Sequence, residues 1–139
     1  MVKLHNLDLA AERVGVEVAY DEQPGIVLKL ARMNNPAMIA WKNGPAGQDR
    51  LRELKTKLAP ADVGERWARE AMAECVLLGW SGIDGDDGQP LPYSAETALE
   101  LLTDPRKYPF FLFVLNAASD MNRYLEADKA DAAKNSGTA

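Results

Sequence analysis

The chain is 139 residues long, with 47% hydrophobic and 27% charged residues, values typical of one globular domain with a core of ordinary size. Its formal net charge of −5 at pH 7 argues against a nucleic-acid partner, because such binders usually carry a basic excess. No apolar run approaches the roughly 18 residues of a membrane span, and the N-terminal segment lacks the apolar stretch of a signal peptide. We therefore expect a cytoplasmic protein without a membrane partner.

The first predicted element is a β-hairpin over residues 13–33. Apolar residues occupy alternate positions from Val14 to Tyr20, the period of a half-buried strand. Pro24-Gly25 then supplies the residues of a turn, and the alternation resumes from Ile26. An isolated hairpin is only marginally stable, so we expect it to pack on the helices that follow.

Helices are predicted over residues 36–79. Asn34 or Asn35 is suited to cap the first of them, with Pro36 at its first position. The pattern then divides this region into three helices, over 36–42, from about 48 to Pro60, and over 61–79. The last has the clearest apolar stripe in the chain, and both Trp67 and Cys75 fall on it, which predicts buried positions for them.

An irregular acidic loop is predicted over residues 80–93, followed by helices over 94–126. Ser94 is a suitable N-cap for a helix over 95–103. Pro109 opens a long final helix whose apolar stripe runs on to Leu125, and a frayed tail is expected over 127–139. The predicted fold is a single domain over 1–139 of the α+β class, predominantly α-helical, with an N-terminal β-hairpin packed on four to five helices.

Few residues of this chain are suited to catalysis. It has one histidine, His5, and one cysteine, Cys75, and these lie in different kinds of predicted structure. No phosphate-binding loop, dinucleotide fingerprint, nucleophile elbow or pair of zinc-spaced histidines occurs. We therefore expect a protein that is not an enzyme and that has no cofactor, metal or catalytic residue.

The acidic loop is a candidate calcium site, because closely spaced carboxylates on a glycine-rich loop can bind this ion. In an EF-hand numbering that starts at Asp84, Gly88 takes position 5 and Ala95 takes position 12, where oxygen ligands are required. Starting one residue earlier places Ile83 at the first ligand position. An ordinary acidic turn is the favoured interpretation, and an irregular cation site is the alternative.

The same loop supplies the candidate residues for a partner interface. Aromatic side chains frame it, and no basic residue occurs between Asp84 and Asp104, so it would repel phosphate and attract a basic protein segment. Two simpler interpretations stay open: the aromatic residues pin the loop to the helices, and the acids form a solvated face. The candidate interface residues are Trp80, Asp84, Asp86, Asp87, Leu91 and Tyr93.

The segment from Trp80-Ser81-Gly82-Ile83-Asp84 through Asp87-Gly88 to Leu91-Pro92-Tyr93-Ser94 resembles the central signature of tail assembly chaperones of long-tailed phages or prophages. The hairpin, the Asp104-Pro105 break and the final helix are similar to parts of those chaperones as well, so the resemblance extends over most of the chain. It implies a non-catalytic protein that binds the tape measure protein, and often the tail tube subunit, during tail assembly. It also implies action in the host cytoplasm and absence from the mature virion.

Two other functions compete with this interpretation. One is a structural virion protein of the tail or connector, which would persist in purified particles. The other is a small calcium- or ligand-binding module that uses Asp84 to Asp87, in which case calcium would raise the melting temperature. Self-association, through the edge of the hairpin, is a further expectation.

Overall fold

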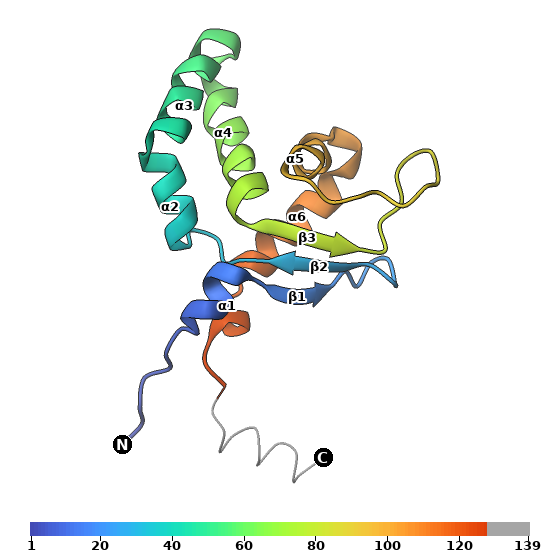
Figure 1. The fold of residues 1–139 in the computed structure, drawn as a ribbon. Coiled ribbons are helices and arrows are strands. Elements are labelled where there is room, and N and C mark those ends of the chain that lie inside the picture. Colours follow the sequence, from blue (N-terminus) through green and yellow to red (C-terminus); the bar gives the residue numbers. More distant parts are fainter. Residues whose placement is uncertain (128–139) are drawn as a thin grey trace.

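A computed structural model describes residues 1–127 of the chain, and the predicted tail lies outside these residues except for Ala127. Its centre is an antiparallel sheet in the order β1-β2-β3, formed by β1 (Val16–Ala19), β2 (Val27–Leu30) and β3 (Leu77–Ser81) (Figure 1). β1 and β2 form the predicted hairpin, with Val18 opposite Leu28, and Leu28 is in turn opposite Trp80 of β3. Side chains alternate between the two faces, so these three residues point into the core.

The strand β3 corrects the predicted helix over 61–79. The helix α4 (Pro60–Cys75) ends four residues earlier, and the chain turns at Val76 to pair with β2. A short apolar run such as Val76-Leu77-Leu78 fits a buried helix or a buried strand equally well, so periodicity could not separate the two. The run forms a strand because its backbone groups pair with those of β2, a strand that lies far away in the sequence.

The predicted start of the hairpin at residue 13 is also wrong. A short helix, α1 (Leu9–Val14), precedes the sheet, because the Asp8 side chain accepts hydrogen bonds from the backbone N–H groups of Ala10 and Ala11. Gly15, at φ 95°, ends this helix and directs the chain into β1. The apolar alternation therefore begins at Val16.

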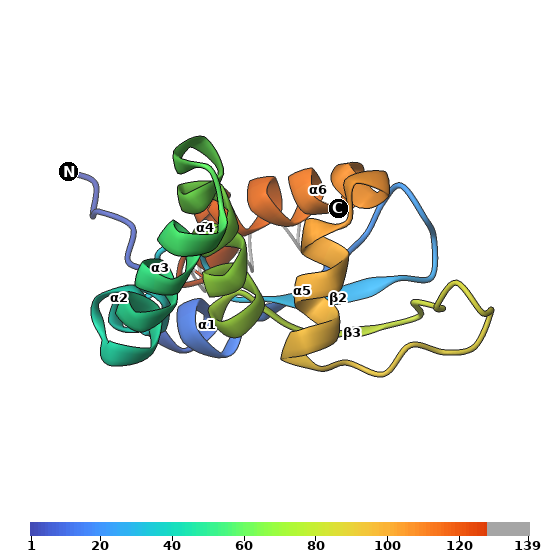
Figure 2. The same ribbon diagram turned by 90° about the horizontal axis from the view of Figure 1, so that it is seen from above.

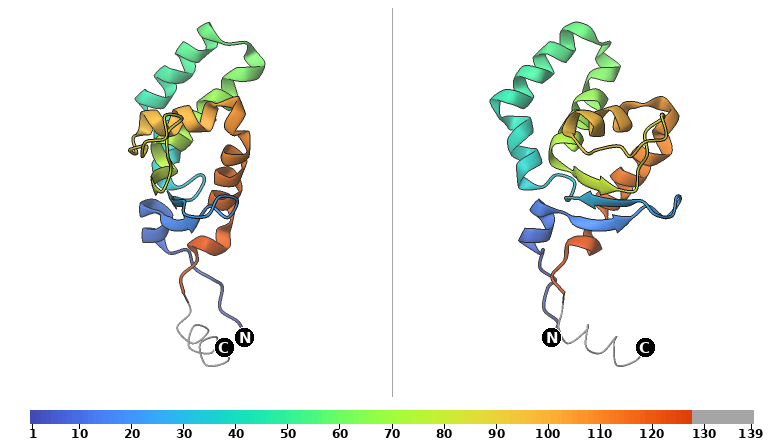
Figure 3. Two further views of the ribbon diagram at one scale, coloured as in Figure 1. Left: turned by 90° about the vertical axis from the view of Figure 1, so that its right-hand side faces the viewer. Right: turned by 45° about the vertical axis from the view of Figure 1, so that its right-hand side comes forward.

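The helices α2 (Pro36–Asn43), α3 (Pro45–Lys57) and α4 form an arm that rises from one end of the sheet (Figures 1 and 3). Each begins with proline, which suits the first helical position because no N–H is needed there. Asn35 confirms the predicted cap: its side chain accepts from the Met38 N–H and donates to the carbonyl oxygens of Arg32 and Cys75. This fully buried amide therefore joins the base of the arm to the sheet.

The last third of the chain contains α5 (Ala95–Thr103), a 3₁₀ turn η1 (Pro105–Lys107), α6 (Tyr108–Ser119) and a second 3₁₀ turn η2 (Met121–Tyr124). Ser94 caps α5 as predicted. The predicted extension of the final helix to Leu125 is wrong, because Asp120 accepts from the Asn122 N–H and starts η2. Tyr124 then inserts into the core, where its hydroxyl donates to the Leu30 carbonyl oxygen at 3.1 Å.

The predicted α+β, mostly helical class is confirmed. α5 and α6 pack against the sheet, as the view from above shows (Figure 2). The Tyr20 ring contacts α6 at Phe110, with ring centroids 5.7 Å apart, and at Phe113, at 4.9 Å. One hydrophobic cluster joins β1, β2, β3 and α4 to α6. Within residues 1–127, no helix combines the length and the apolar character needed to cross a bilayer.

Candidate partner-binding groove

Two aromatic residues fix both ends of the acidic loop. The Trp80 indole N–H donates to the Leu91 carbonyl oxygen at 2.8 Å, and the Tyr93 hydroxyl donates to the Leu77 carbonyl oxygen at 2.8 Å. The two rings meet edge to face with centroids 5.0 Å apart. Burial raises the pKa of Tyr93 above its ordinary value of 10.0, which disfavours loss of the donated proton at alkaline pH. Trp80 and Tyr93 therefore hold the loop on β3, which favours the pinning interpretation for these two residues.

The start of the loop lies against the turn of the β-hairpin. Gly82 has φ 82°, and a Cβ atom there would lie 2.0 Å from the carbonyl oxygen of Gly25. Any side chain at this position would separate the two segments, since 3.0 Å is already closer than real Cβ contacts. Glycine is required at this position because it allows the loop and the turn to touch.

The aspartates of the loop have separate roles. Asp87 accepts a hydrogen bond from the Gln89 N–H at 3.0 Å and so stabilises the turn itself. Asp86 points toward η1, where it lies 3.5 Å from Arg106 and 3.6 Å from Lys107. Across the described part of the chain, no three His, Cys, Asp or Glu side chains converge as metal ligands do.

The acidic stretch from Asp84 to Asp104, which contains no basic residue, contacts basic side chains in the folded chain. Arg106 and Lys107, which follow it directly in sequence, form ion pairs with both Asp86 and Asp104. Hydrogen bonds from the side chain and backbone of Arg106, and from Lys107, hold the pKa of Asp104 well below its usual range. The acidic patch is therefore partly neutralised. Two carboxylates of the loop line the surface next to η1, and of these Asp86 is paired whereas Asp84 is not.

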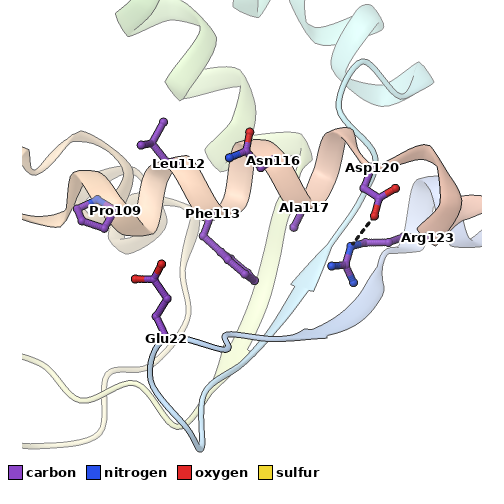
Figure 4. A pocket seen from close by; sticks show the side chains of 8 residues that line it. All are labelled: Glu22, Pro109, Leu112, Phe113, Asn116, Ala117, Asp120 and Arg123. Carbon is purple, nitrogen blue, oxygen red and sulfur yellow. Dashed lines mark ion pairs between the residues drawn. The ribbon is translucent and has the colours of Figure 1, made fainter.

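Beside these residues the surface is hollowed into a groove. One hollow of about 450 Å³ lies between α6 and the hairpin turn (Figure 4). It adjoins a hollow of about 580 Å³ between the turn, the start of the acidic loop and η1, with which it shares Glu22 and Pro109. A third, of about 290 Å³, lies between the loop and α5 and shares Asp84 and Leu101 with the second. Neighbouring hollows share lining residues, and we call the three hollows together the groove.

The α6 side of the first hollow is a second helix face, with apolar and polar residues, that the sequence did not predict. The inner face of the helix carries Phe110 and Val114, which are buried. The residues that line the first hollow recur at helical spacing along another face, where Leu112 is 37% exposed. These residues are Pro109, Leu112, Phe113, Asn116, Ala117 and Asp120. The signal was present in the sequence, because a helix with apolar residues on more than one face needs a partner for each.

The family model described as YdaY prophage protein matches residues 30–135 of the chain. The chain belongs to this prophage protein family. The match includes the acidic loop, α5, η1 and α6, whereas α1, β1 and the hairpin turn lie outside it. Comparison with curated proteins and with solved structures gave no match. The match confirms that the protein derives from a prophage. The family description does not mention tail assembly.

Three of the six predicted interface residues line the groove of this YdaY-family chain: Asp84, Asp86 and Leu91. Trp80, Asp87 and Tyr93 instead hold the loop in place. Glu22 was not among the predicted residues. It lies in the hairpin turn, close to the start of α6 (Figure 4). No local pattern could have identified it, because the contact joins segments that are far apart in the sequence.

Proposed function

We propose that this prophage protein is a non-catalytic tail assembly chaperone that binds the tape measure protein in the host cytoplasm and keeps it soluble. The observation that carries the proposal is the second apolar face of α6, which lines an open groove. The resemblance of residues 80–94 to tail assembly chaperones and the membership in a prophage family support it. The tail tube subunit is a second expected client.

The groove has the features of a site for a helical client. An apolar face that the chain leaves open marks a contact with another molecule, because water is a poor partner for it. Amphipathic helices bind in apolar grooves through side chains one turn apart. Tape measure proteins are long and helical, so many copies of this chain along one client would cover its apolar stripes.

The edge of β1 supports self-association as part of the same proposal. β3 has residues of the acidic loop along its outer side, tied by the hydrogen bond from Tyr93 to Leu77. β1 pairs only with β2 in the described part of the chain, which leaves its other edge open to a strand of a second copy. Copies joined in this way would bind a long client side by side.

Co-expression with the tape measure protein encoded nearby tests the proposal. Affinity capture of this chain, followed by light scattering, would report the soluble client and the number of copies on it. We expect a soluble complex with many copies per client. An insoluble client and a free chain would refute the proposal, and presence of the chain in purified particles would favour the structural virion alternative.

A calcium titration separates the remaining alternative. Asp86 and Asp87 already have protein partners, so we expect no stabilisation by the ion. A melting temperature that rises with calcium concentration would instead support a cation-binding module, because a ligand of the folded state must stabilise it.

A further inference from the structure

The charged residues around the groove are unevenly paired. Each of its three cationic side chains is engaged with a carboxylate of the same lining: Arg106 and Lys107 with Asp86 and Asp104, and Arg123 with Asp120 at 3.7 Å. No cationic group of the lining is therefore left to attract an anionic partner.

Three other carboxylates of the lining form no ion pair with any residue from 1 to 127. They are Glu22 in the hairpin turn, Asp84 in the acidic loop and Glu100 on α5. All three are exposed, and they come from three separate elements, so they are distributed along the groove. Glu22 lies beside the α6 face in the first hollow, Asp84 lines the second and third hollows, and Glu100 lines the third. A partner that extends along the groove thus meets apolar side chains from α6 and, farther along, unpaired negative charges.

We propose that the groove binds an α-helix that carries Lys or Arg residues on both sides of an apolar stripe. The inference rests on the proposed function, since it specifies the kind of client segment that the groove accepts. A helix is the expected form, because the α6 residues that line the first hollow follow i, i+3, i+4 spacing, the spacing of the ridges against which another helix packs. The cationic flanks are expected from the unpaired carboxylates, which would repel an acidic helix.

Two designed peptides test the charge preference directly. Both are amphipathic helices with the same leucine stripe, and their flanks carry lysine in one and glutamate in the other. Fluorescence anisotropy with the full chain should give a Kd at least about tenfold lower for the lysine peptide at low salt, from several rim pairs acting together. The difference should shrink as salt is raised, because exposed charges are screened. Equal affinity, or no binding of either peptide, would overturn the inference.

Charge reversal tests whether the three unpaired carboxylates cause the preference for the lysine peptide. The triple variant Glu22→Lys, Asp84→Lys, Glu100→Lys should lose the preference for the lysine peptide. Its matched control is Glu17→Lys, Glu74→Lys, Glu126→Lys, which reverses three exposed carboxylates outside the groove with the same change in net charge. Circular dichroism melting curves should show that both triple variants fold. The inference would be wrong if the control lost the preference as fully as the groove variant.

The same variants distinguish this inference from the proposed function. If the wild-type chain keeps the tape measure protein soluble and the groove variant does so equally well, the chaperone proposal stands and the cationic helix does not. If the wild-type chain fails to retain the client, the proposed function fails. Binding of the lysine peptide would then still identify the groove as a site for a cationic helix of a different protein.

Discussion

The helices α4 and α6 both pack on the core but differ in how the rest of their surfaces is covered. α4 buries one apolar stripe, and ion pairs satisfy its charged residues, with Glu70 paired to Arg66 at 3.0 Å and to Arg50 of α3 at 2.6 Å. α6 carries apolar residues almost all round and buries only part of them, with Tyr108 48% and Leu112 37% exposed. The chain thus satisfies α4 with its own residues, whereas part of the apolar surface of α6 stays exposed to solvent.

The largest expected effect is on the buried face of α6. Phe110→Ala removes a ring that is 8% exposed and that contacts Tyr20 of the hairpin. We expect a loss of about 3–5 kcal/mol in the free energy of unfolding, because the cavity cannot be refilled. Urea denaturation followed by circular dichroism measures it. A loss below about 1 kcal/mol would show that the inner face of α6 contributes little to the core.

On α4, the removal of one carboxylate should have a moderate effect. Glu70 is 9% exposed and accepts from Arg50 at 2.6 Å and from Arg66 at 3.0 Å, so it joins α3 to α4. Glu70→Ala leaves Arg50 without its main partner, and we expect a loss of about 1–2 kcal/mol. The control is Asp49→Ala, since Asp49 and its partner Arg52 are 69% and 68% exposed and such a pair should contribute less than about 0.5 kcal/mol. Equal effects of the two substitutions would contradict this account of α4.

Tyr124, which anchors the end of α6 through η2, should make stability depend on alkaline pH. Burial raises the pKa of Tyr124 to about 12 from its ordinary value of 10.0. Its stabilisation is therefore complete below pH 10 and is lost as pH rises toward about 12. Tyr124→Phe, which removes one hydrogen bond, should cost about 1 kcal/mol at neutral pH.

Urea midpoints of the wild type and Tyr124→Phe, measured from pH 8 to pH 11.5, would show this dependence. The wild type should lose its advantage as the pH rises above 10, because only the wild type has the Tyr124 hydroxyl to ionise. A constant difference between the two proteins over this range would mean that the hydroxyl is not buried in the way described.

The smallest expected effect on stability is on the open face of α6. Leu112→Ser should change the free energy of unfolding by no more than about 0.5 kcal/mol, because this side chain is already partly in water. It should nevertheless reduce the amount of captured client. Ile39→Ser is the matched control, since Ile39 is 50% exposed on the arm and lies outside the lining of the groove. Equal client capture by both variants would argue against the open face of α6.

Local features of the fold could be predicted from the sequence because their partners are close along the chain. The caps at Asn35 and Ser94 each join residues three positions apart. β3 could not be predicted, since its pairing depends on β2 about fifty residues earlier. The candidate site divides in the same way: the loop was identified from its composition, whereas Glu22 reaches the groove only through the fold.

Hydrogen exchange of the chain with and without the tape measure protein tests the central claim most directly. Amides in the hairpin turn over 20–26, in the loop over 82–93 and along α6 surround the groove, whereas α3 lies on the arm, away from it (Figure 1). We predict slower exchange in the first three segments on client binding and unchanged exchange in α3. Protection confined to the arm, with the loop and the turn unaffected, would contradict the account.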